Sequence, residues 1–189
     1  MKTIEVPIRE QVSEGSQQLF DQLQKHLGKV PNLYAVVGYS ATALGAFLQF
    51  DEQLSHGVFT AKEREAIALI VSQVNQCDYC LAAHTLIAKG RGFSLDDTIN
   101  IRQAEAVDSK LMATLQLAES ITTNRGDVEA ELLDKFFGAG YDEGALMELI
   151  GLVTVSIFTN YVFTLTNFPV DFPAAPVLNK AMSAQQASS

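Results

Sequence analysis

Apolar residues recur along this sequence at the three- and four-residue spacing of an α-helix, and this periodicity constrains the fold most. The first stripe follows the capping residue Ser13 and ends at Gly28, and its members are Leu19, Phe20, Leu23 and Leu27. No segment alternates with period two over enough residues to predict a strand. The sequence therefore predicts an all-α protein.

Capping residues divide the chain into successive helices. Thr60 and Glu63 form a T-x-x-E capping box ahead of an apolar run, and Ser94 with Asp97 offers a similar start. Pro31 opens a short helical piece. Further helices are predicted from Ser40 through Leu54, from the cysteines to Gly90, and at about 109–123, 127–137 and 142–167.

A chain of 189 residues and 20.6 kDa is of the size that forms a single domain. We assign that helical domain to residues 1–168. Residues 169–189 contain Pro169, Pro173 and Pro176, which oppose helix formation, and end in SAQQASS. The sequence predicts an extended and flexible C-terminal tail there.

The segment from Leu149 to Phe168 has twenty residues without a charge, which is long enough to cross a bilayer. Its flanks are acidic, at Glu148 and Asp171, with no nearby Lys or Arg to set an orientation. We therefore interpret it as a buried or interface helix and expect no membrane partner.

Charge and the N-terminal residues bear on partners and location. Lys and Arg number 13 against 22 Asp and Glu, giving a net charge of −9 with no basic cluster, so nucleic acid is not an expected partner. The first ten residues, MKTIEVPIRE, carry charges where a secretory signal needs an apolar run. A cytoplasmic location is expected.

The two cysteines, Cys77 and Cys80, stand three residues apart. A disulfide framework would spread several cysteines along the chain, whereas a CxxC pair in a reducing compartment is typical of a redox couple or half of a metal site. On a helix, Cys77, Cys80 and His84 fall within about a 60° wedge. The i, i+4 spacing lets His84 accept the Cys80 proton directly or through one water.

Glu65 joins this group only if the chain bends. Twelve residues of continuous helix would put Glu65 roughly 18 Å from Cys77. The polar run Gln73-Val-Asn75-Gln76 offers a break, at which the first helix ends and the next folds back. The break would also place Cys77 in the first turn of a helix, where the dipole favours a thiolate.

These four residues resemble the signature of the alkylhydroperoxidase D-like (AhpD-like) branch of the carboxymuconolactone decarboxylase superfamily. That signature is a glutamate, an eleven-residue gap, CxxC, three residues and a histidine, and Glu65, Cys77, Cys80 and His84 match it. The likeness extends to LGKVPNLYAVVG upstream and to the late apolar helix with its Asn. The resemblance implies an AhpD-like helical bundle that forms homo-oligomers, trimers or hexamers.

The resemblance also implies a thiol peroxidase or disulfide reductase. In that scheme Cys80 attacks a hydroperoxide to give a sulfenic acid, and Cys77 resolves it as a Cys77–Cys80 disulfide. His84 would take the Cys80 proton, with Glu65 orienting the imidazole. The dipole argument favours Cys77 as the more acidic thiol, whereas the resemblance and the contact with His84 favour Cys80.

One departure from the family pattern concerns proton transfer. The best-known members carry a second histidine directly before the second cysteine, where this chain has Tyr79. Part of their relay is therefore absent here or replaced by a phenol. The reductant, an unknown dithiol of thioredoxin or lipoyl type, is not fixed by the resemblance.

Three other interpretations compete with the peroxidase. Cys77, Cys80, His84 and Glu65 together could bind zinc, although structural zinc sites pair CxxC with a second Cys/His pair that this sequence lacks. A lactone decarboxylase of the same superfamily would not depend on CxxC. A non-catalytic scaffold would leave both thiols unreactive. The peroxidase interpretation needs no bound cofactor or metal.

Overall fold

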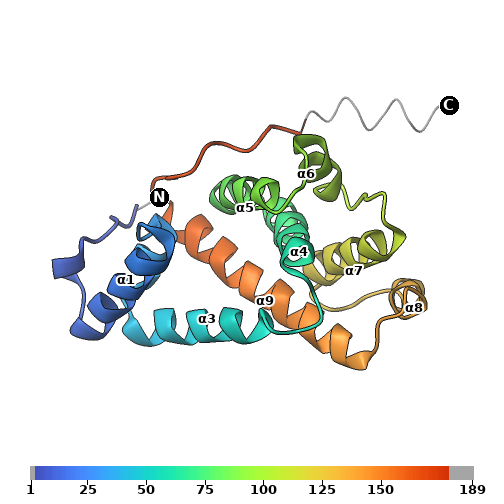
Figure 1. Ribbon diagram of the computed structural model, residues 1–189, viewed down its shortest axis with the longest axis horizontal. Helices are drawn as coiled ribbons and strands as arrows, with labels where there is room; N and C mark the ends of the chain where they lie inside the picture. Colours follow the sequence, from blue (N-terminus) through green and yellow to red (C-terminus); the bar gives the residue numbers. More distant parts are fainter. Residues whose placement is uncertain (1–2, 179–189) are drawn as a thin grey trace.

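The computed structural model describes residues 3–178, which form one short 3-10 turn and nine α-helices, with no strand among them. The predicted all-α class is therefore confirmed (Figure 1). The elements are the turn Arg9–Gln11, α1 Glu14–Leu27, α2 Asn32–Val37, α3 Ala41–Leu54, α4 Ala61–Val74, α5 Asp78–Gly90, α6 Leu95–Ile101, α7 Ser109–Asn124, α8 Ala130–Gly138 and α9 Glu143–Thr166.

Side-chain caps begin most of these helices, because the first backbone N–H groups of a helix have no partner within it. Each cap accepts from the backbone N–H three residues on, and the caps that the sequence suggested are Ser13, Ser40, Thr60, Ser94 and Asp142. The helix predicted at 127–137 begins later, at Ala130, and its N-cap Glu129 makes no capping hydrogen bond.

α4 is the central helix of the bundle. Its residues from 66 to 72 are all buried, and it packs against α5, α7 and α9. A helix that is apolar on all sides requires neighbours on all sides, which explains this position. The α4 backbone is thus a fixed support for any side chain that it presents to the site.

α9 lies along the length of the molecule and contacts α2 and α3 near one end and α7 near the other (Figure 1). It is long and apolar enough to span a membrane, but 44% of its most apolar window is buried within the molecule. Its exposed apolar residues are Met147, Ile150, Phe158, Tyr161 and Leu165. The predicted homo-oligomer stays a prediction, and these residues are a surface that it would bury.

Two hydrophobic clusters make up the core. One joins α4 to α7, α8 and α9, and the other joins α1, α2 and α3 to the start of α5. Both cysteines belong to the second cluster, whereas most of α4 belongs to the first. The CxxC motif therefore lies where the two clusters meet.

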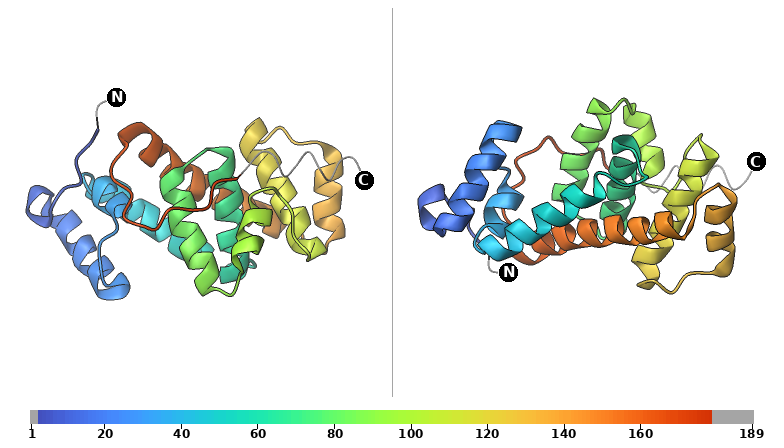
Figure 2. Two further views of the ribbon diagram at one scale, coloured as in Figure 1. Left: turned by 90° about the horizontal axis from the view of Figure 1, so that it is seen from above. Right: turned by 60° about the horizontal axis from the view of Figure 1, so that its bottom comes forward.

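Residues 167–178, which we call the strap, follow α9 without helical structure. Figure 2 shows the strap passing over α5 toward α6. Its backbone accepts hydrogen bonds from Asn32 at Pro169 and from Arg102 at Pro176. This part of the predicted tail is extended but attached to the domain, and residues 179–189 of that tail lie outside the described residues.

The capping box of α4 gives a test of the fold. Thr60 Oγ1 accepts from the Glu63 backbone N–H at 3.2 Å, and the Glu63 carboxylate accepts from the Thr60 N–H at 2.7 Å. Thr60→Ala should lower the free energy of unfolding by about 1 kcal/mol, measured by urea denaturation. Thr164→Ala, at an exposed position of α9, is the control. Equal stability of the Thr60 variant and the wild type would contradict this role.

Candidate active site

A tight bend between α4 and α5 builds the site, as the polar run around Asn75 predicted. α4 ends at Val74, Asn75 is its C-cap, and Cys77 is the N-cap of α5. Gln76 between them has a φ of 53°, in the left-handed region that residues other than glycine rarely adopt. The Cys77 N–H donates to the Ser72 carbonyl at 3.0 Å, which closes the bend.

The bend folds α5 back along α4, and Glu65 then meets His84. Glu65 Oε2 lies 2.8 Å from His84 Nδ1, with side-chain exposures of 17% and 26%. Burial lowers the pKa of His84, but the charges of Glu65, Cys80 and Asp51 and the hydrogen bond that His84 donates to Glu65 raise it above its ordinary value. The pair thus favours an imidazolium with a fixed ring orientation.

The two sulfurs lie beside this pair, at the start of α5. Both cysteines are free, and the exposed fractions are 0% for Cys77 and 2% for Cys80. The Cys80 backbone N–H donates to Cys77 Sγ at 3.3 Å, so Cys77 acts as the cap of its own helix. The motif therefore holds both thiols close together and buried.

The surroundings make Cys80 the more acidic thiol. Interaction with Cys77 lowers the pKa of Cys80 to about 7, against the effect of burial and with help from His84, Asn160 and Thr159. Interaction with Cys80 and burial raise the pKa of Cys77. These effects act against the helix dipole and the Cys80 backbone N–H, both of which favour a thiolate on Cys77.

Residues of α9 complete the polar surroundings of the sulfurs. The Cys80 thiol lies 3.9 Å from Thr159 Oγ1. Asn160, fully buried, accepts from Asn75 at 2.9 Å and donates to Ser72 at 3.2 Å, so it ties α9 to the bend. Sequence analysis noted the Asn of this helix but gave Thr159 no role, because only tertiary packing brings α9 to the cysteines.

A cavity of about 530 Å³ opens onto the site, and Cys80, His84 and Glu65 line it. His84 makes no direct hydrogen bond to Cys80 among the described residues. Aromatic residues missed by sequence analysis also line the cavity, namely Tyr34, Phe47 and Phe172. Burial, followed by the charges of Asp51, Glu65 and Cys80, raises the pKa of Tyr34 to about 12, so this phenol stays protonated near neutral pH.

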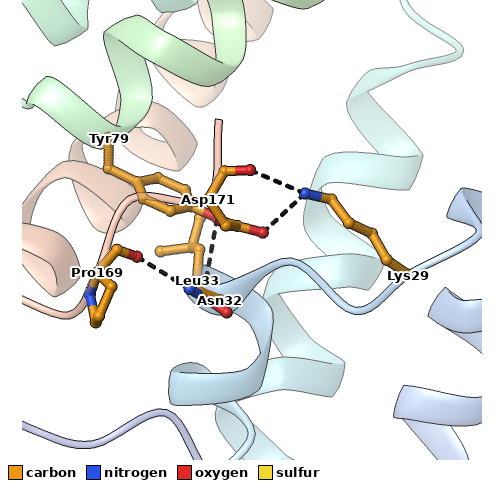
Figure 3. A network of polar contacts seen from close by, with 6 residues as sticks. All are labelled: Lys29, Asn32, Leu33, Tyr79, Pro169 and Asp171. Carbon is orange, nitrogen blue, oxygen red and sulfur yellow. Dashed lines mark hydrogen bonds and ion pairs between the residues drawn. The ribbon is translucent and has the colours of Figure 1, made fainter. Parts of the chain in front are cut away.

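The Tyr79 hydroxyl makes hydrogen bonds that connect α5 to α2 and to the strap. Its hydroxyl donates to Asp171 Oδ1 at 2.8 Å and accepts from the Leu33 N–H at 3.2 Å (Figure 3). Burial raises the pKa of Tyr79, and the hydrogen bond to Asp171 adds to this effect. The phenol therefore points to the strap, and its hydrogen bonds are not directed at His84.

The zinc alternative is not supported by the geometry. Within residues 3–178, no three His, Cys, Asp or Glu side chains cluster in a way that could hold a metal ion. Glu65 is instead hydrogen-bonded to His84. The arrangement defines a helical protein with a buried thiol pair and an adjacent acid–imidazole pair.

Residues 41–120 match the Carboxymuconolactone decarboxylase family, and this segment contains the bend and all four site residues. No curated protein matches the sequence significantly.

Solved structures share the fold over most of the chain. An uncharacterized peroxidase-related protein from Silicibacter sp. TM1040 superposes with a TM-score of 0.77 and 21% identity, covering 92% of this chain and 91% of the other. A protein from Ralstonia eutropha JMP134, described as an alkylhydroperoxidase AhpD core and uncharacterized peroxidase-related protein, gives a TM-score of 0.78 and 19% identity, covering 88% and 90%. The debrominase Bmp8, in complex with 2,3,4-tribromopyrrole, gives 0.75 and 18%, covering 99% and 97%.

Over residues 41–120 the chain is similar to the Carboxymuconolactone decarboxylase family, and it shares its fold with proteins described as peroxidase-related and as an alkylhydroperoxidase AhpD core. Both findings agree with the resemblance that the spacing from Glu65 to His84 indicated.

The Glu65–His84 pair predicts a pH dependence of stability. Because the folded state raises the His84 pKa, the ion pair stabilises the fold below the ordinary pKa of histidine and is lost as pH rises through the raised value. The free energy of unfolding of the wild type should exceed that of Glu65→Gln by about 1 kcal/mol near pH 6, and this difference should shrink toward pH 9. Urea denaturation from pH 5 to 9 measures the gap, and a gap that widened with pH would contradict the pairing.

Proposed function

We propose that this protein is a thiol-dependent peroxidase that reduces hydroperoxides through Cys80 and Cys77. The proposal rests on one observation: Cys80, a buried thiol whose pKa is lowered to about 7, lines the same cavity as the hydrogen-bonded Glu65–His84 pair. Perturbed titratable groups in a cleft are characteristic of enzyme active sites. Structural neighbours described as peroxidase-related have the same fold.

In the first step, the Cys80 thiolate attacks the terminal oxygen of the hydroperoxide and the O–O bond breaks. The leaving alkoxide takes a proton from the His84 imidazolium through one bridging water, and an alcohol is released. Cys80 becomes a sulfenic acid. Glu65 holds His84 Nδ1 at 2.8 Å, so the other ring nitrogen is left for this transfer.

In the second step, the Cys77 sulfur attacks the Cys80 sulfenic sulfur. The hydroxyl of the sulfenic acid leaves with the Cys77 proton as water, and a Cys77–Cys80 disulfide forms. The Cys77 sulfur already contacts the Cys80 backbone at 3.3 Å, so the two residues are adjacent before reaction. An external dithiol, of thioredoxin or lipoyl type, then reduces the disulfide by exchange, which requires a reducing compartment such as the cytoplasm.

A second candidate substrate class is a brominated aromatic ring. One structural neighbour is a debrominase in complex with 2,3,4-tribromopyrrole, and the aromatic lining of the present cavity suits a planar ring. In the first step of such a reaction, bromine would be transferred from the ring carbon to the Cys80 sulfur, and the ring carbon would take a proton. Cys77 would then form the same disulfide and release bromide with a proton. Bromide release from tribromopyrrole is the assay that separates the two classes.

Substitutions of the cysteines test whether Cys80 attacks the peroxide and Cys77 forms the disulfide. Cys80→Ser should abolish turnover of cumene hydroperoxide, whereas Cys77→Ser should allow one oxidation and then stall as a sulfenic acid. Thiol titration should show two thiols lost per wild-type chain after peroxide. Sustained turnover by the Cys80 variant would refute the proposal, and unchanged thiol counts would favour a decarboxylase or a scaffold.

The pH dependence of the first oxidation tests the role of His84. The rate should rise with pH as Cys80 ionises through about 7, because only the thiolate attacks. His84→Gln removes a cation that favours the thiolate, so the profile should move to higher pH, with a loss of about tenfold at neutral pH for a one-unit shift. Stopped-flow measurement gives the profile. The matched control is His56→Gln, whose exposed ring pairs with Glu52 outside the cavity, and an identical shift in both variants would contradict the assignment.

A further inference from the structure

The strap is attached to the CxxC motif through one carboxylate. Asp171 Oδ1 accepts from the Tyr79 hydroxyl at 2.8 Å, and Asp171 Oδ2 lies 2.8 Å from Lys29 Nζ, which also donates to the Asp171 carbonyl at 3.1 Å (Figure 3). Tyr79 directly precedes Cys80 in the sequence. Asp171 therefore joins the strap to the segment that carries the reactive thiols.

This attachment is firm because its inner partner cannot move freely. The Tyr79 side chain is 1% exposed, and its ring packs against Phe163, Phe168 and Phe172 with centroid distances of 5.6, 5.0 and 5.5 Å. A hydrogen bond from a buried phenol to a carboxylate is of the stronger, charge-assisted kind. The outer partner, Lys29, is half exposed and contributes less on its own.

The attachment positions Phe172 in the wall of the reactive cavity. Phe172 follows Asp171, lines the cavity that contains Cys80 and His84, and lies under the Lys29 ammonium at 4.3 Å. Cys80 is only 2% exposed, so reagents reach its sulfur through this cavity. The strap has no helical or strand structure of its own, so side-chain contacts decide where Phe172 lies.

We propose that Phe172 is a specificity-determining residue that limits the size of molecules reaching Cys80, and that Asp171, held between Tyr79 and Lys29, is its positioning residue. The substrates admitted are compact apolar or aromatic hydroperoxides that pack against the Phe172 ring. This inference rests on the proposed function only in taking Cys80 as the attacking thiol.

Alkylation of Cys80 tests the inference without peroxide. In a Cys77→Ser background, the rates with N-ethylmaleimide and with the bulkier fluorescein maleimide give a size ratio. Phe172→Ala and Asp171→Ala should each raise the rate of the bulky reagent relative to the small one by about tenfold, which corresponds to about 1.4 kcal/mol in activation free energy. Phe172→Trp should change the ratio in the opposite direction.

The controls separate a change in access to Cys80 from a general effect of mutation or a loss of folding. Asp134→Ala removes an exposed acid on α8, away from the strap, and should leave the ratio unchanged. Circular dichroism checks folding, and Asp171→Asn and Phe172→Leu replace the alanine variants if these do not fold. An unchanged ratio in the strap variants, or an equal acceleration of both reagents, would overturn the inference.

Peroxide kinetics then distinguish the two proposals. In the same strap variants with Cys77 intact, KM should fall for a hydroperoxide bulkier than cumene hydroperoxide, while the rate of oxidation by hydrogen peroxide changes little. If no hydroperoxide reacts but the alkylation ratio still shifts, the peroxidase proposal fails and the role of the strap stands. If hydroperoxides react, but neither the alkylation ratio nor the KM for the bulky hydroperoxide changes, only the proposed role of the strap fails.

Discussion

The sharp reversal of the chain at Asn75, Gln76 and Cys77 is the constraint on which the rest of the site depends. A continuous helix would separate Glu65 from the cysteines by roughly 18 Å, whereas the reversal brings Glu65 to 2.8 Å from His84. It requires Gln76 to adopt a left-handed conformation, and the buried Asn160 of α9 holds the bend through Asn75 and Ser72. The chemistry of α5 is therefore supported by a helix from the far end of the domain.

Within that frame, the electrostatic character of the thiols follows from burial and from their nearest polar neighbours. Ionisation of one of two adjacent buried sulfurs disfavours ionisation of the other; Cys77 and then His84 lower the pKa of Cys80, whereas Cys80 and burial raise the pKa of Cys77. The helix dipole and the Cys80 backbone N–H, which donates to Cys77 Sγ at 3.3 Å, act in the opposite direction and favour charge on Cys77. Proteins described as peroxidase-related and a debrominase share this fold.

The cavity wall is also where the sequence was least informative. Proline content predicted an extended tail, and residues 167–178 are extended. Nothing in the local pattern showed that Asp171 would meet Tyr79 and Lys29, because these residues are 92 and 142 positions away in the chain. Composition predicts that a segment lacks helix, but only packing decides whether it lies against the domain.

The sequence by itself determined the helical class, most helix ends and which four residues form the candidate site. Caps such as Thr60 and Ser94 act on backbone groups three residues away, and the spacing from Glu65 to His84 is a property of the chain alone. The tertiary structure decided what surrounds each thiol. Burial, the contact with Thr159 and the placement of Phe172 arise between segments distant in sequence, and such interactions exist only when the chain has folded.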